Sequence, residues 1–157
     1  MQLRRSLFLA VMLSILLQPL TSFAQNASQS LLNGIWHHTV LIRTIGNQAL
    51  EPLPLAGDSF VEFKPDGTWT LTAPRYKSAG TYVWLDSERI ETTVVESNLL
   101  IQIGLVSIKQ VRVDASRLNL ITVQTAEDSA KYRLPIKPGS PPFPDVMLTS
   151  IFSRVSD

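Results

Sequence analysis

Apolar and polar residues alternate with a period of two along almost every segment that follows the first 24 residues of the chain. This period places successive side chains on opposite faces of an extended strand, whereas an amphipathic helix repeats every 3.6 residues. The alternating segments end at Gly, Pro, Asp or Asn, the residues that tight turns require. The pattern therefore predicts an all-β protein of about nine or ten short strands.

The predicted strands follow one another at hairpin spacing. Between two of them lies Pro65-Asp66-Gly67, in which proline presets φ for the bend and glycine accepts a positive φ. Asp86-Ser87-Glu88 and Asp114-Ala115-Ser116 are predicted to be turns as well. Such a meander closes into a barrel or folds into a sandwich, and closure removes the unpaired edges of an open sheet. We expect a small closed barrel of about 8 to 10 strands in one domain, residues 25–157. The expected strands are residues 36–45, 59–64, 68–73, 81–85, 89–95, 99–103, 106–113, 117–123, 131–136 and 146–155, the last of which could also be a short helix.

Residues 1–24 have the three parts of an export signal. Arg4 and Arg5 give a basic start, Leu7–Leu17 is an apolar run, and Ser22-Phe23-Ala24 places small residues before a cleavage point. The apolar run is about half of the roughly 20 residues that a membrane-spanning helix needs. We expect a signal peptide that is removed, a mature chain without a stable membrane span, and a periplasmic or secreted protein.

The composition excludes several classes of function. The chain has no cysteine, so it has no disulfide, no thiolate nucleophile and no cysteine-rich zinc site. Residues 1–24 hold two of the 14 basic side chains and none of the 13 acidic ones, which leaves a formal charge of −1 on residues 25–157. A near-neutral chain without a basic run offers no footprint for nucleic acid or for an anionic membrane surface.

The residues that carry most enzyme chemistry do not converge. His37 and His38 are the two histidines, and as neighbours on a strand they point to opposite faces and cannot chelate one metal. The phase of the strand places His38 inward with Trp36, Val40 and Ile42. No Gly-x-Ser-x-Gly motif occurs, and Glu62, Glu91 and Glu96 alternate with apolar residues as solvated side chains do. We expect no catalytic residue, no cofactor and no metal site.

Three motifs together resemble the small lipocalin-like domains of exported bacterial proteins. They are Gly34-Ile35-Trp36, the segment Phe63–Trp69 that contains Asp66-Gly67-Thr68, and Gly80-Thr81-Tyr82-Val83-Trp84, and the resemblance spans about residues 31–136. It implies a small β-barrel in which Gly34 opens the first strand and Trp36 plugs the closed end. It further implies that a C-terminal arginine covers the tryptophan, with Arg154 or Arg133 as candidates.

The candidate ligand-binding residues come from an aromatic-rich stretch and from two cations. Aromatic residues concentrate between positions 60 and 84, where they either fill the core or line a ligand cavity. Arg112 shares a strand face with Val106, Ile108 and Gln110, while Lys109 lies on the opposite face, and one of the two could anchor a carboxylate ligand such as a fatty acid. The candidate set is His38, Phe60, Trp69, Tyr82, Trp84 and Arg112.

Two functions of different classes fit these observations. The first is an exported binding protein that holds a small hydrophobic, lipid-like molecule in the barrel lumen, without catalysis. The alternative is a protein-interaction module: an inhibitor, an immunity protein or an envelope-assembly factor. Its barrel would be packed solid, and it would contact an envelope protein through the Pro-rich loops at residues 47–57 and 137–145.

Overall fold

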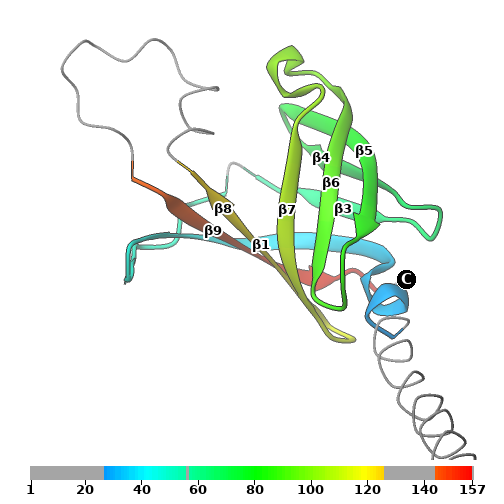
Figure 1. The fold of residues 1–157 in the computed structure, drawn as a ribbon, viewed down its shortest axis with the longest axis horizontal. Helices are drawn as coiled ribbons and strands as arrows, with labels where there is room; N and C mark the ends of the chain where they lie inside the picture. Colours follow the sequence, from blue (N-terminus) through cyan, green and yellow to red (C-terminus); the bar gives the residue numbers. More distant parts are fainter. Residues whose placement is uncertain (1–26, 56, 126–143, 157) are drawn as a thin grey trace, which may run out of the picture.

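The structure is a computed structural model that describes residues 27–55, 57–125 and 144–156. The expected export signal and the expected strand at residues 131–136 lie outside the described residues. All strands of the described part belong to one antiparallel sheet (Figure 1). They are β1 (Gly34–Ile45), β2 (Gln48–Ala49), β3 (Phe60–Phe63), β4 (Thr68–Ala73), β5 (Tyr76–Trp84), β6 (Arg89–Ser97), β7 (Val106–Val113), β8 (Arg117–Gln124) and β9 (Val146–Arg154).

Eight of these strands close into a barrel. From β3 to β9 each strand pairs with the next along the chain, and β1 pairs with both β3 and β9, which joins the two edges of the sheet. The short β2 is an extra strand that pairs only with the end of β1. The predicted antiparallel meander closed into a barrel is confirmed.

One predicted strand is not observed, and the strand predicted at residues 81–85 begins earlier, at Tyr76, as β5. The segment Leu99–Ile103 was expected to be a strand, but its centre is the 3₁₀ helix η1 (Leu100–Gln102). It lies in the connection from β6 to β7, where no neighbouring strand is left to pair with it, and its backbone bonds to itself through Gln102 N–H and Leu99 C=O at 2.9 Å. The last segment was predicted as a closing strand with a short helix as the alternative, and it is the strand β9, which fills the place between β8 and β1.

One end of the barrel, called the closed end from here on, is filled by the hydrophobic core. Trp36 is fully buried there, and its indole Nε1 donates at 2.8 Å to the carbonyl of Leu32, the last of helical residues 27–32. The Arg154 guanidinium lies 4.2 Å from the centre of the Trp36 ring and donates to the carbonyls of Leu31, Asn33 and Ala115. Cations stack favourably on indole faces. The arginine over Trp36 is therefore Arg154, and Arg133 lies outside the described residues.

Gly34 lies where this closure allows no side chain. Its φ is +127°, and a Cβ at this position would come 2.7 Å from Nη1 of Arg154. Residues other than glycine rarely adopt such a φ. The glycine two residues before Trp36 thus permits the close approach of Arg154 to the start of β1.

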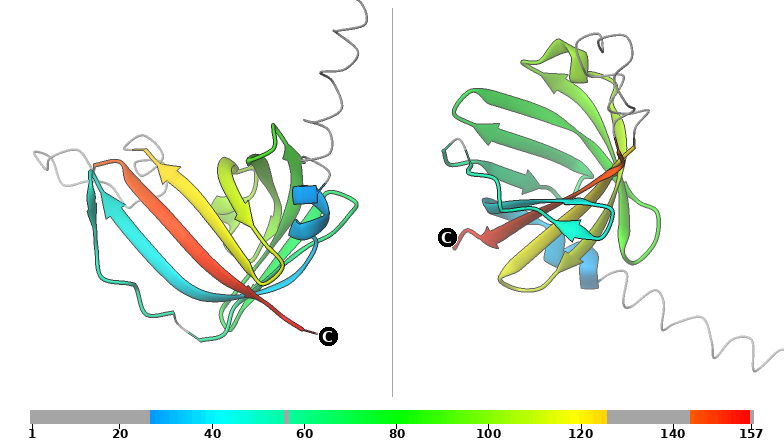
Figure 2. Two further views of the ribbon diagram at one scale, coloured as in Figure 1. Left: turned by 90° about the horizontal axis from the view of Figure 1, so that it is seen from below. Right: turned by 90° about the vertical axis from the view of Figure 1, so that its left-hand side faces the viewer.

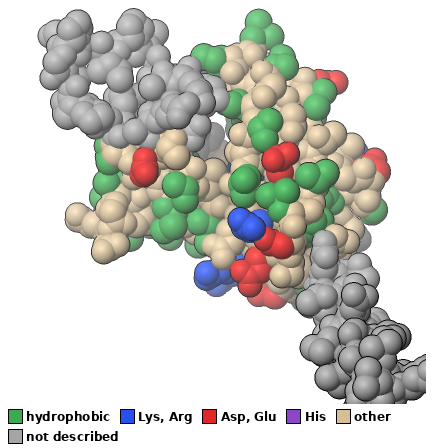
Figure 3. Space-filling view, viewed as in Figure 1, with side chains coloured by type: hydrophobic (Ala, Val, Ile, Leu, Met, Phe, Trp, Pro, Cys, Tyr) green, Lys and Arg blue, Asp and Glu red, His purple; other side chains and the backbone are tan. Residues whose placement is uncertain are grey.

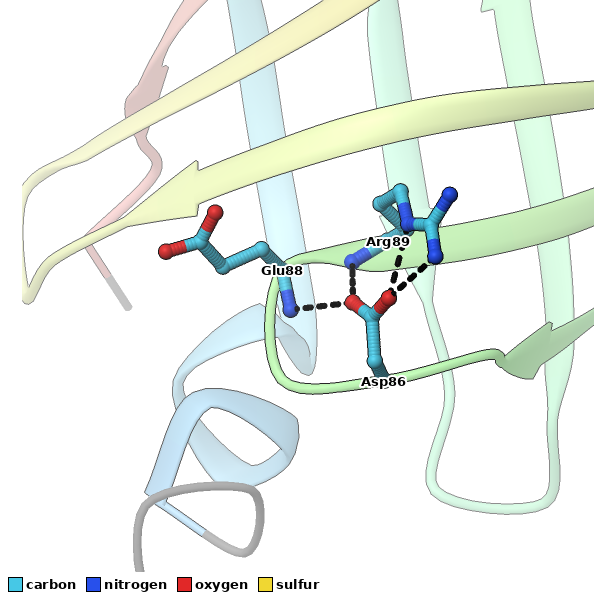
Figure 4. A network of polar contacts seen from close by, with 3 residues as sticks. All are labelled: Asp86, Glu88 and Arg89. Carbon is cyan, nitrogen blue, oxygen red and sulfur yellow. Dashed lines mark hydrogen bonds and ion pairs between the residues drawn. The ribbon is translucent and has the colours of Figure 1, made fainter. Parts of the chain in front are cut away.

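Three hairpin turns at the closed end share one device, an aspartate that accepts backbone N–H groups. Asp66 Oδ1 accepts from Thr68 N–H, and Asp114 Oδ1 accepts from Ser116 and Arg117 N–H. Figure 4 shows the third turn, where Asp86 Oδ1 accepts from Glu88 and Arg89 N–H at 2.9 Å and Oδ2 is 2.7 Å from the Arg89 guanidinium. These bonds lower the pKa of Asp86, the one from Glu88 N–H most. All three turns were predicted from their Asp-containing sequences.

A bulge in β1 reverses the side-chain pattern part-way along the strand. The pairing with β9 shifts between His38 and Val40, so Thr39 is an extra residue. His38 pairs with the buried Phe152, but Val40 pairs with Ile151 and Leu41 with Ser150. Residues that are directly opposite in a sheet point to the same face. Leu41 therefore faces the interior, and the prediction that Val40 and Ile42 share the face of His38 is wrong.

Away from the closed end the barrel wall separates into two groups of strands. The β7–β8 ladder ends at Gln110 and Ile121, and the β1–β3 ladder covers only Gly34–His37 of β1. As Figures 1 and 2 show, β8, β9 and the far part of β1 lean away from β3–β7. We call this part of the barrel the upper half.

Candidate functional site

The candidate site is the interior of the upper half. The pairing register of the strands shows which side chains face it. Leu118, Leu120 and Phe152 are buried, and every second residue farther along their strands points to the same face. Most inward side chains beyond the core are partly exposed, whereas Ser78 and Thr92 are buried. The partly or fully exposed ones include four aliphatic side chains, Leu41, Leu71, Val94 and Leu148, and five polar or charged ones, Arg43, Ser107, Lys109, Thr122 and Ser150.

Lys109 lies at the floor of this interior. It pairs across the sheet with Ile90, which is fully buried, and is two residues from the buried Val111 on the same face of β7. Its Nζ donates to Oγ1 of Thr122 at 3.3 Å, one step beyond the last pair of the β7–β8 ladder. Burial lowers the pKa of Lys109 from its ordinary 10.5 to about 8. A charged amine is thus held where water solvates it poorly.

The interior of the upper half has cations but no facing carboxylate among the described residues. The three acids on described strands all face outward, since Glu62 pairs with Ile35, Glu91 with Val83, and Glu96 with Ala79. Within the described part of the chain, the ion pairs involve other residues and none includes Lys109. An ammonium in such a place is costly unless an anion compensates it.

Arg43 belongs to the same interior face. It pairs with Leu148 on β9, which pairs in turn with Thr122 on β8, the residue that accepts the bond from Lys109. Because neighbouring strands are about 4.8 Å apart, Arg43 and Thr122 are about 10 Å apart along this row. Arg43 is exposed at the rim, whereas Lys109 is deeper.

His38 lies between the core and the upper half. Its ring stacks on Phe152 with 4.6 Å between centroids, and its Nε2 is 3.1 Å from the carbonyl of Val40 at the bulge. Burial is the main cause that lowers its pKa. The predicted inward position of His38 is confirmed. His37 faces outward, stacks on Phe60 and is 3.2 Å from Asp58.

Three of the predicted aromatic residues belong to the closed end. Trp69 is in the core and its Nε1 donates to Thr81 C=O at 3.1 Å. Tyr82 is buried with its hydroxyl bonded to Lys64 C=O at 2.8 Å, and Trp84 packs against the same core. All three fill or cover the core, and Tyr82 and Trp84 also line a cleft at the closed end.

Phe60 and Arg112 do not line the interior. Phe60 pairs with His37 and the exposed Thr72, which places it on the outer face, and Arg112 is exposed next to Asn119. On β7 both faces carry two aliphatic side chains and one cation, so alternation alone could not decide between Arg112 and Lys109. The pairing with Ile90 decides it: Lys109 is the inward cation.

Two clefts on the described part of the surface lie elsewhere and are not lined by Lys109. The first, of about 490 Å³, lies at the closed end between helical residues 27–32 and the Asp66 turn, beside Tyr82 and Trp84. The second, of about 360 Å³, is lined by residues of β4, β5 and β6. Aliphatic side chains also gather on the outside of the barrel (Figure 3), where Val106 and Ile108 of β7 and Leu100 of η1 are exposed.

The described residues contain neither a cluster of potential metal ligands nor a membrane-spanning helix. Among the described residues, no three His, Cys, Asp or Glu side chains come close enough together to hold a metal ion. The described helical residues include no helix of the length and hydropathy needed to cross a membrane. No protein-family model matches the chain, and no curated protein is similar enough to count as a relative.

Proposed function

We propose that this protein binds a small hydrophobic molecule inside the upper half of its barrel. The observation that supports this is the uneven filling of the interior: side chains fill the closed end, while Leu41 and Leu148 face the interior of the upper half and remain partly exposed. Small-molecule sites are typically concave and aliphatic with a few polar groups that orient the ligand. The N-terminal sequence supports export, so the ligand would be met outside the cytoplasm.

Binding would draw on the burial of apolar surface of the ligand. Each square ångström of apolar surface removed from water contributes about 25 cal/mol, less the cost of immobilising the ligand. The hydroxyls of Ser107, Thr122 and Ser150 and the amine of Lys109 are the polar groups available to fix its orientation. Binding of this kind requires no covalent change in the ligand, so the proposed role is carriage or sequestration.

A neutral fluorescent probe tests the proposal without regard to charge. N-phenyl-1-naphthylamine titrated into the purified protein is expected to show saturable, one-to-one binding with a blue-shifted emission. Leu148→Gln, which makes the interior more polar, should weaken binding by about tenfold. Thr149→Gln is the matched control, because Thr149 pairs with Ile42 on the outer face. A probe that does not saturate on the folded protein would remove the proposed function.

The alternative function, a protein-interaction module, is favoured by one observation. On the outer faces of β5 and β7, Val83 and Val106 are more than half-exposed and Ile108 is half-exposed. Leu100 of η1 is 81% exposed. Exposed apolar patches on soluble proteins often mark partner sites. If a stoichiometric protein co-purifies with the tagged chain, is lost in Ile108→Glu and is retained in Lys109→Met, the outer face rather than the interior carries the function.

A further inference from the structure

We infer that the interior of the upper half is a site for an amphiphile with a single negative charge, whose head group is held by Lys109 and whose chain runs toward the open rim. This inference rests on the proposed function and names the class of ligand. It follows from the positions of the charged side chains in the interior and from the N–H donors of Lys109 that have no acceptor among the described residues. It also follows from the change from packed core side chains at the floor to partly exposed side chains toward the rim.

The first step is the donor count at Lys109. An ammonium group has three N–H donors and no acceptor. Among the described residues one donor is used, by Oγ1 of Thr122 at 3.3 Å. Since that acceptor is a neutral hydroxyl, the charge itself is not neutralised. A carboxylate or sulfate oxygen would supply the missing acceptors and the missing charge in one group, through charge-assisted hydrogen bonds.

The second step is the charge around the site on every strand that adjoins Lys109. Facing it from β6 are Ile90 and Thr92, and from β8 Leu120 and Thr122, none of which is charged. The other titratable groups on this interior face of β1 and β9 are His38, Arg43 and, at the closed end, Arg154. Among the described residues the interior is thus cationic or neutral throughout. A cationic head group would be repelled, and a neutral one would leave Lys109 uncompensated.

The third step is the orientation of the ligand. Below Lys109 the core is closed by Ile90, Val111 and Leu118, so a chain cannot extend in that direction. Leu148 lies in the same cross-strand row as Lys109, Leu41 lies in the row of Val111, and at the rim of β6 and β7 the η1 segment carries exposed Leu100 and Ile101. A chain whose head group is at Lys109 would run along these aliphatic side chains. Arg43 ends the row that runs from Lys109 through Thr122 and Leu148, so it adds a second positive charge at the rim, on the side of Leu148 away from Lys109.

The burial of Lys109 is an independent argument for this assignment. A lysine whose pKa is lowered to about 8 destabilises the free protein in its charged form. Groups perturbed by burial in this way are concentrated at functional sites. A methionine or leucine would fill the position on β7 without that penalty, which indicates that the amine serves binding rather than packing.

Displacement of the neutral probe by a matched pair of ligands tests the inference. Dodecanoate and 1-dodecanol have the same chain and differ in the charge of the head group. At pH 7 dodecanoate is expected to displace N-phenyl-1-naphthylamine from the wild-type protein at a concentration at least tenfold lower than 1-dodecanol. Lys109→Met should reduce that preference to about twofold or less, and Lys109→Arg should keep most of it. Arg43→Gln should lower it by about threefold.

The controls separate this inference from the proposed function. Lys77→Met removes an exposed lysine on the outer face of β5 and should leave the preference unchanged. Equal displacement by dodecanoate and 1-dodecanol, in both wild type and Lys109→Met, would overturn the assignment of an anionic ligand while leaving the hydrophobic site intact. Failure of the probe to bind at all would remove both. Circular dichroism of each variant confirms that a lost preference is not a lost fold.

Discussion

The closed end and the upper half of the barrel are built from the same strands, yet they differ in almost every physical respect. At the closed end the turns are short and capped by aspartate, and Trp36 is fully buried beneath Arg154. In the upper half the β7–β8 and β1–β3 ladders have ended, and the inward side chains are partly exposed. The comparison indicates that the packed core lies at one end of the barrel, and the proposed ligand site lies at the other.

The largest effect is expected from Trp36→Ala. Truncation of a buried tryptophan typically costs about 3–5 kcal/mol, because it leaves a cavity as well as removing apolar contacts. Here it also removes the ring on which Arg154 stacks. Urea unfolding at pH 7 measures the loss directly. A loss below about 1 kcal/mol would show that the closed end does not determine stability, contrary to the comparison.

A matched pair of leucines sharpens the comparison between the two halves. Leu118 is fully buried at the closed end, and Leu148 faces the upper half on the neighbouring strand. Leu118→Ala should cost about 2–5 kcal/mol, whereas Leu148→Ala, already partly solvated, should cost about 1 kcal/mol. The same two variants should reverse their order in probe binding, since only Leu148 faces the proposed site. Equal losses of stability would contradict the division.

A change of the opposite sign, a gain in stability, is expected at Lys109. The pKa of Lys109 is lowered in the folded protein, so between pH 8 and 10.5 the unfolded chain holds more protons and stability rises with pH. Below pH 8 the charged amine destabilises the fold by up to about 3 kcal/mol. Lys109→Met should therefore raise the free energy of unfolding at pH 7 by up to about 3 kcal/mol, and the gain should shrink as the pH approaches 10.5.

The pH dependence of this gain is the decisive measurement. Urea unfolding of wild type and Lys109→Met at pH 7 and pH 10 gives the difference at each pH, and Lys77→Met serves as the control with a change within about 0.5 kcal/mol at both. A constant difference between wild type and Lys109→Met would show that the amine is solvated in the folded protein. The opposite sign, a loss at pH 7, would show that an anion of the protein already compensates it.

Local patterns in the sequence predicted the frame of the barrel. The predicted bounds of β4 and β7 match the observed strands, and the three Asp-containing turns are where the sequence placed them. Trp36 and Gly34 could be assigned to the closed end. These features depend on residues close in sequence, namely on alternation and on turn chemistry, so they are visible without tertiary contacts.

The candidate site was less accessible to prediction, because it depends on which face of each strand turns inward. On β7 the two faces have similar composition, and only the pairing of Lys109 with Ile90 distinguishes them. On β1 the bulge at Thr39 carries no mark in the sequence, so Leu41 and Arg43 were assigned to the wrong face. The η1 segment is as apolar as a strand, but the closed sheet has no edge left for it to join.

The bulge in β1 has a consequence for how such a protein diversifies. Because Thr39 is the extra residue, its deletion would remove the bulge and still leave Val40 opposite Ile151 and Leu41 opposite Ser150, so Leu41 and Arg43 would stay inward. Regular pairing without the bulge at unchanged length would instead turn Val40 and Ile42 inward, and so replace a positively charged entrance with an aliphatic one. Selectivity in this barrel can therefore change through strand register as well as through substitution.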